Sequence, residues 1–285
     1  MDQLAENRAR VQEVLEALQK LHRRERIRIK ASKSEGLALD DSKFGGLPLI
    51  PLGGEPPRTE DGQRLALLAQ ISCAQLPANS LLPAQGYLQF WFLPDDTYGV
   101  DLDDLASGRF SRVLYLPAGD FEPLERVEEL YSAFDDSEFE MPFQDAEGRI
   151  WGMALTFERD EQGITSSSEA FGELFVGEWQ KRFPDQPLES FDDLPYDWGE
   201  GLIWDTPEEQ APQHQLGGYP TFTQYDPRTG ELAVFDSLLF QIDSQFEQGE
   251  FLLCWGDMGI CNFFLPADAL GELDFSRVLY TYDCG

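Results

Sequence analysis

One six-residue sequence occurs twice in this chain, and this repetition limits the possible folds more than any other feature. Residues 110–115 read Phe-Ser-Arg-Val-Leu-Tyr, and residues 275–280 repeat them 165 positions later (275 − 110). Other matches follow in the same order: residues 44–48 with 216–220, 67–71 with 238–242, and 89–94 with 262–266. One register with small insertions explains all four matches, so the sequence predicts an internal duplication.

The repeats divide the chain into segments. We predict a single domain over residues 1–285, made of an N-terminal helix at 1–26, repeat one at 42–115, an acidic insertion at 116–216 and repeat two at 216–284. The helix is predicted because apolar residues recur at the spacing of one helical face: Leu4, Val11, Val14, Leu15, Leu18 and Leu21. Residues 27–32 then alternate apolar and polar side chains, as a half-exposed strand does.

Short apolar segments bounded by glycine and proline predict strands in the rest of the chain. The clearest is at 86–93, others are at 151–157 and 275–280, and the run at 65–71 is either a strand or helix-like. Residues 251–255 and 260–265 are predicted to form a hairpin, in whose turn Gly256 or Gly259 has a positive φ and Asp257 caps backbone amides. With one further helix at 169–183, this pattern predicts an α+β fold with predominantly antiparallel sheet.

The charge of the chain is strongly one-sided. There are 53 acidic and 21 basic residues, which gives a formal net charge of −32. Such a field repels nucleic acid phosphates and anionic lipids and attracts basic proteins or cations, although it also serves solubility alone. The N-terminus does not read as a signal peptide and no apolar run reaches membrane length, so we expect a cytoplasmic protein.

The sequence offers little for a metal, a cofactor or a catalytic group. The four cysteines form no Cys-x-x-Cys pair and only two histidines are present, so we expect no zinc site and no cofactor. The acidic run from Asp95 departs from the calcium-loop template, with Val100 at the glycine position and Ala106 at the final glutamate position. We interpret it as a solvated loop, and calcium binding there stays open. No nucleotide-binding or hydrolase motif occurs.

Several motifs together resemble the YwqG-like family of bacterial proteins. They are Ser-Lys-Phe-Gly-Gly-x-Pro at 42–48, the run at 67–71, residues 86–90 followed by Asp95-Asp96, and residues 255–259 followed by 274–276. The resemblance extends from Ile27 to Cys284. It implies a β-rich roll with an internal duplication, a bacterial cytosolic origin and a neighbourhood of toxin–immunity genes. It implies no established activity and therefore no functional residues.

We expect a non-catalytic protein-binding module, of immunity or antitoxin type, whose acidic face from Asp120 to Asp205 docks a basic protein. The alternative is a hydrolase that uses a pair of carboxylates in a cleft between the repeats. Because duplicated halves often form a site where they meet, we predict a binding cleft near Gln70, Gln241, Asp243, Trp255 and Asp257.

Overall fold

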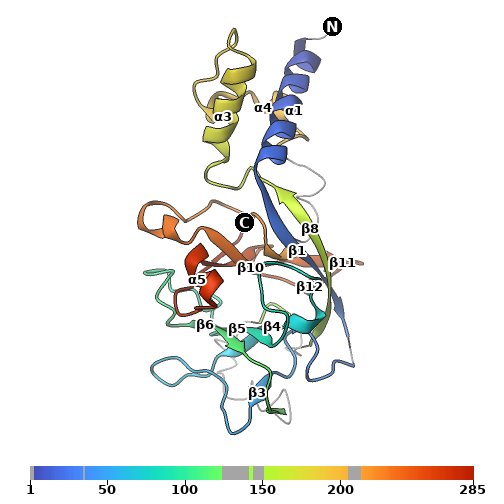
Figure 1. Ribbon diagram of the computed structural model, residues 1–285, viewed down its shortest axis with the longest axis vertical. Helices are drawn as coiled ribbons and strands as arrows, with labels where there is room; N and C mark the ends of the chain where they lie inside the picture. Colours follow the sequence, from blue (N-terminus) through green and yellow to red (C-terminus); the bar gives the residue numbers. More distant parts are fainter. Residues whose placement is uncertain (1–2, 35, 124–140, 144–150, 205–212) are drawn as a thin grey trace.

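The strands of the two repeats form one large antiparallel sheet. The computed structural model describes residues 3–34, 36–123, 141–143, 151–204 and 213–285. Ten strands follow one another in the order β14-β13-β10-β9-β1-β8-β2-β4-β5-β6, and every pairing between them is antiparallel. The sheet curls into a nearly closed roll in the lower part of Figure 1. The predicted α+β class with predominantly antiparallel sheet is confirmed.

This strand order is palindromic, and it shows the duplication directly. Repeat one supplies β2 (Lys43–Phe44), β4 (Ala66–Ser72), β5 (Tyr87–Phe92) and β6 (Ser111–Leu116). Repeat two supplies their counterparts β9 (His214–Gly217), β10 (Ser237–Asp243), β13 (Ile260–Leu265) and β14 (Leu279–Asp283). Both copies of the Gly-Gly turn have positive φ at both glycines, Gly45 and Gly46 in one and Gly217 and Gly218 in the other.

The centre of the sheet is exchanged between the halves. The strand β1 (Arg23–Lys33) precedes repeat one but pairs with β9 of repeat two. The strand β8 (Met153–Gly163) precedes repeat two but pairs with β2 of repeat one. The two long strands pair with each other over their full eleven residues. Neither half therefore has a complete sheet of its own.

Aromatic side chains from the two repeats meet inside the roll. The ring of Phe90 in β5 lies 4.4 Å from that of Phe240 in β10 and 5.0 Å from that of Phe263 in β13. Phe44 of β2 also packs on Phe240, with ring centroids 6.0 Å apart. All four rings are inaccessible to solvent. Because these strands are far apart in the sheet, the contacts require it to be rolled, with a single core shared by both repeats.

The N-terminal helix and two helices from the segment between the repeats form a second, smaller core. The helices α1 (Gln3–Leu21), α3 (Phe171–Arg182) and α4 (Tyr196–Gly199) lie together at the end of the long β1–β8 ribbon, away from the roll (Figure 1). The apolar face of α1 packs there on the aromatic face of α3, with Val11, Val14, Phe175 and Trp179 buried. We call residues 3–21 and 164–204 the helical unit. The helix predicted at 169–183 corresponds to α3.

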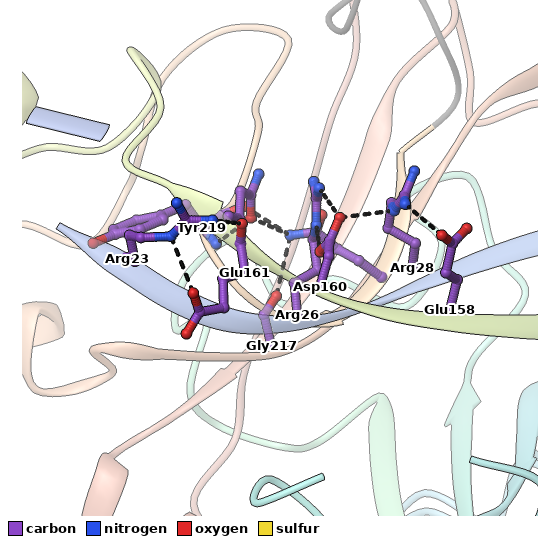
Figure 2. A network of polar contacts seen from close by, with 10 residues as sticks. Arg23, Arg26, Arg28, Glu158, Asp160, Glu161, Gly217 and Tyr219 are labelled. Atoms are coloured by element: carbon purple, nitrogen blue, oxygen red, sulfur yellow. Dashed lines mark hydrogen bonds and ion pairs between the residues drawn. The ribbon is translucent and has the colours of Figure 1, made fainter. Parts of the chain in front are cut away.

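The N-terminal helix is shorter than predicted, because Arg23–Arg26 begin β1 and do not continue the helix. Figure 2 shows the charged face that results. Arg26 holds Asp160 with two hydrogen bonds of 2.9 and 2.8 Å, Arg28 forms an ion pair with Glu158 at 3.1 Å, and Arg23 forms one with Glu161 at 3.3 Å. Burial alone would raise the pKa of Asp160, but Arg26 and Arg28 hold it below its usual value. Pairing along β8 thus outweighs the helical preference of arginine and glutamate.

Two other strand predictions were wrong. The strand β12 (Glu250–Leu253) pairs with β11 (Gln245–Glu247) in a separate two-stranded sheet, so it forms no hairpin with β13. The second copy of the repeated hexapeptide is a strand only from Leu279, and its first four residues form a turn after α5 (Ala267–Glu272). A small third sheet joins β3 (Leu49–Pro51) to β7 (Phe121–Pro123).

Candidate functional site

Gln70 and Gln241, two of the predicted site residues, hold the core together and do not line a cleft. Both are fully buried and occupy equivalent positions in β4 and β10. The side-chain oxygen of Gln70 accepts a hydrogen bond from the Leu49 N–H at 2.9 Å, and that of Gln241 accepts one from the Thr221 N–H at 2.8 Å. Their amide nitrogens donate to the carbonyls of Leu39 and Asp41 in repeat one and of Gln213 in repeat two. Each glutamine fixes the loops around its own Gly-Gly turn.

The predicted turn residues Trp255 and Asp257 differ in burial. Trp255 is fully buried among the rings of Phe92, Tyr98 and Tyr282, whereas Asp257 is exposed. The side chain of Asp257 makes no hydrogen bond to a described residue, so the predicted cap is wrong. Gly256 has the positive φ that was predicted, 50°. Gly259 is required for another reason, since a Cβ there would collide with the Asp283 carbonyl.

Asp243 lies beside the buried His214, which sequence reasoning did not select. The backbone N–H of Asp243 donates to His214 Nδ1 at 3.0 Å, so Nε2 carries the proton and donates to Gln245 Oε1 at 3.1 Å. Burial lowers the pKa of His214 to about 4, and burial together with Asp283 raises the pKa of Asp243 to about 6. Both ring nitrogens are occupied by core partners, which leaves His214 no position from which to activate a nucleophile.

These two groups predict opposite pH dependences of stability. Asp243 titrates at 3.8 when unfolded and at about 6 when folded, so its contribution to the free energy of unfolding falls as the pH rises through that window. His214 titrates at 6.5 unfolded and about 4 folded, so its contribution falls as the pH drops. Asp243→Asn should therefore stabilise the protein at pH 7 by about 1–3 kcal/mol, with the gain vanishing below pH 4. His214→Gln should instead reduce the loss of stability in acid.

Urea denaturation of both variants and the parent protein between pH 4 and pH 7 measures these slopes. Relative to the parent protein, the free energy of unfolding of Asp243→Asn must increase as the pH rises. That of His214→Gln must increase as the pH falls. An Asp243→Asn variant whose stability follows the parent's pH profile would contradict the assignment of a raised pKa to this carboxyl group.

A groove does exist between the repeats, but at the open side of the roll. It has a volume of about 550 Å³ and is lined by β6 from one repeat and by residues 273–278 from the other. The two copies of the repeated hexapeptide thus face each other across it. We call it the seam groove. Arg109 and Arg112 line it together with one carboxylate, Glu60. The repeated hexapeptide itself was the signal in the sequence that could have located this groove.

The other notable surface lies where the helical unit meets the loop at 224–226. A hollow of about 690 Å³ lies between α3 and the loops at 189–192 and 224–226. The described residues that line it include five carboxylates and no basic residue: Glu169, Glu173, Glu189, Asp192 and Asp226. Of these, Asp226 forms an ion pair with Arg228 at 2.7 Å, and the other four are exposed. We call it the acidic hollow.

The described residues hold no group of three or more His, Cys, Asp or Glu side chains that could bind a metal ion. Within the same residues, no helix has the length and apolar character needed to cross a membrane. All four cysteines are free, with Cys73 and Cys261 buried and Cys254 and Cys284 half-buried. Burial raises the pKa of Cys73 to about 11, so this thiol is inert at neutral pH.

Comparison with the curated proteins gives no match. A family model matches residues 42–284, which include both Gly-Gly turns, both copies of the hexapeptide and the strand β8 between them. This range leaves out α1 and β1. It includes the residues that line the seam groove and the acidic hollow. The chain therefore belongs to the family described as a domain of unknown function, DUF1963.

Proposed function

We infer that this protein is a non-catalytic protein-binding module whose helical unit docks a basic partner. One observation carries the proposal. Residues 164–204 contain nine carboxylates and two basic residues, Lys181 and Arg182. Both basic residues form ion pairs with the single buried carboxylate, Glu178. The other eight are exposed: Glu169, Glu173, Asp185, Glu189, Asp192, Asp193, Asp197 and Glu200.

None of these eight carboxylates forms an ion pair within the described part of the chain. Their charge is therefore available to a partner, on a unit that stands clear of the roll (Figure 1). The net charge of −32 adds a long-range attraction for cationic proteins. In the acidic hollow, carboxylates lie beside the apolar side chains of Val176 and Phe191. This combination suits a lysine or arginine, whose stem packs on apolar atoms while its charge meets the carboxylates.

The resemblance to YwqG-like proteins supports a more specific form of the proposal. A bacterial immunity-type protein that neutralises a cationic toxin would need a surface of this sign. Its association would be accelerated by charge and weakened by salt, because the Debye length falls to about 10 Å at 0.1 M.

The expected result is that a basic protein is retained from a cell lysate at low salt, and that its association rate falls severalfold between low and moderate salt. A variant with Glu169→Gln, Glu173→Gln, Glu189→Gln and Asp192→Asn removes four charges from the acidic hollow. A matched control removes four exposed charges elsewhere: Glu231→Gln, Glu250→Gln, Asp257→Asn and Glu272→Gln. Surface plasmon resonance of both variants with the retained protein measures the association rates.

Only the hollow variant should associate markedly more slowly than the parent protein. Equal slowing of both variants would show that net charge acts without a defined face. If no basic protein is retained, or retention does not respond to salt, the charge serves solubility and the proposal fails.

A hydrolase acting through two carboxylates is the second candidate, and one observation favours it. Asp243, Ile260 and Asp283 lie in one row across β10, β13 and β14, and burial raises the pKa of both carboxyl groups. A raised pKa suits a general acid. Screening the purified protein against ester, phosphate and glycoside substrates separates the two candidates, since turnover that Asp243→Asn abolishes would select the hydrolase.

A further inference from the structure

The strand β6 ends the sheet and has an edge with no partner strand among the described residues, and this edge borders the seam groove. In an antiparallel pair, residues alternate between those bonded to the neighbouring strand and those whose backbone groups point away from it. The Leu93 N–H donates to the Phe110 carbonyl at 2.7 Å, which fixes this alternation for β5 and β6. The backbone groups of Ser111, Val113 and Tyr115 therefore point away from β5, toward the groove.

Within the described part of the chain, these outward groups are almost all unpaired. The Ser111 carbonyl accepts a hydrogen bond from Arg112 Nη1 at 2.7 Å. The N–H and C=O groups of Val113 and Tyr115 make no hydrogen bond to any described residue. The pairing of β6 with β5 is continuous and contains no bulge, and the strand contains no proline. Such an edge can accept another strand.

The opposite side of the opening differs from β6. The Tyr280 N–H of β14 already donates to the Leu105 carbonyl at 2.9 Å, so the edge of β14 is partly occupied. The two copies of the repeated arginine also differ. Arg277 forms an ion pair with Asp268 at 3.2 Å, whereas its counterpart Arg112 forms none with a described residue. As far as the described residues go, β6 alone therefore brings to the seam groove both a free strand edge and a guanidinium group without an ion-pair partner.

The charge of the groove identifies what it would bind. Two arginines and one carboxylate, Glu60, are among the described residues that line the groove, in a chain of net charge −32. Arg109 forms an ion pair with Asp101 at 3.6 Å, so Arg112 is the cation that has no ion-pair partner among the described residues. A second copy of this chain would bring Arg112 against Arg112 and one highly acidic body against another. A short acidic peptide places no guanidinium group against Arg112 and carries far less negative charge than a second copy, and its carboxylates can bind the guanidinium group of Arg112.

We propose that the seam groove binds an extended acidic peptide segment of a partner protein, which adds to β6 as an eleventh strand. The backbone of the peptide pairs with Val113 and Tyr115, and one of its carboxylates binds Arg112. Main-chain pairing supplies affinity in this mode of recognition, and the flanking side chains select the sequence. The site is distinct from the acidic hollow and takes a ligand of opposite charge.

The test uses the full chain and a fluorescein-labelled hexapeptide of alternating glutamate and valine as the probe. Two control peptides isolate the two interactions: one has lysine in place of glutamate, and one is methylated at every backbone nitrogen. Fluorescence anisotropy should show binding of the probe and a loss of at least about tenfold in affinity for each control, because each lacks one class of hydrogen bond or ion pair. Amide hydrogen exchange at Val113 and Tyr115 should slow when the probe is bound.

Protein variants provide the second comparison. Arg112→Gln should weaken binding of the probe about tenfold, and Arg277→Gln, the same change at the equivalent position of the other repeat, should leave it within about twofold. Equal binding of the methylated peptide would rule out strand addition. Equal binding of the lysine peptide would rule out acidic selectivity, and self-association of the chain through β6 or absence of binding would overturn the proposal.

Discussion

A fragment that ends at Ala118 is expected to be unfolded or aggregated in isolation, although it contains all of repeat one. In the described structure its strand β1 pairs only with β8 and β9, and both of those strands lie after the cut. The strand β2 would also lose one of its two neighbours, β8. Phe90 would lose the ring contacts with Phe240 and Phe263 that fill the roll. Exposed strand edges and apolar side chains of this kind favour aggregation.

Amide NMR dispersion and thermal melting of the fragment test this expectation. Residues 119–285, produced separately and mixed with it, provide the control, because the two pieces together contain every strand of the sheet. The mixture should recover dispersed signals that neither piece shows alone. A fragment of residues 1–118 that melts cooperatively by itself would show that repeat one is an independent folding unit.

Replacing either central glutamine is expected to be the most damaging conservative substitution in the core. Gln70→Leu leaves the Leu49 N–H and the carbonyls of Leu39 and Asp41 without these partners inside the protein. Gln241→Leu likewise leaves the Thr221 N–H and the Gln213 carbonyl without these hydrogen-bond partners. Buried polar groups without partners cost about 1–3 kcal/mol each, so each variant should lose roughly 2–4 kcal/mol of unfolding free energy.

Chemical denaturation compares the two variants with Gln12→Leu as a control. In the parent protein Gln12 is exposed on α1, and among the described residues its side chain bonds only to Glu16. That control should remain within about 0.5 kcal/mol of the parent protein. The duplication also requires the two core variants to lose similar amounts. A loss at Gln70 and none at Gln241 would mean that the repeats share a fold without sharing these internal bonds.

The sequence located the elements whose burial follows a simple local pattern. The apolar runs predicted at 65–71 and 86–93 correspond to β4 and β5, and the aromatic run at 169–183 corresponds to α3. The two strands are buried almost throughout, so a continuous apolar run marks them, whereas α3 buries the face that its aromatic spacing marks. The charged segment at Arg23–Arg26 was misassigned to helix, because its strand conformation depends on Glu161 and Asp160, more than 130 residues away.

The sequence likewise predicted only part of the candidate site. Gln70 and Gln241 were correctly recognised as equivalent, but only the structure shows that their side-chain amides form hydrogen bonds inside the core. The repeated hexapeptide was recognised as the mark of duplication, but its role at the seam depends on which strands end the sheet. Identical residues form a strand from Ser111 and a turn before Leu279, because β6 pairs with β5 from its first residue, whereas the segment before β14 leads out of α5.

The sequence by itself determined the duplication, the antiparallel class and the sign of the surface charge, because these depend on residue types and their order. The tertiary structure alone decided that β1 and β8 cross between the halves. It also decided that, among the described residues, the outer edge of β6 has no partner and Arg112 has no ion pair, whereas Arg277 has one. Each of these depends on contacts between residues distant in sequence. Such contacts form only where the rolled sheet brings their strands together, and no local pattern encodes them.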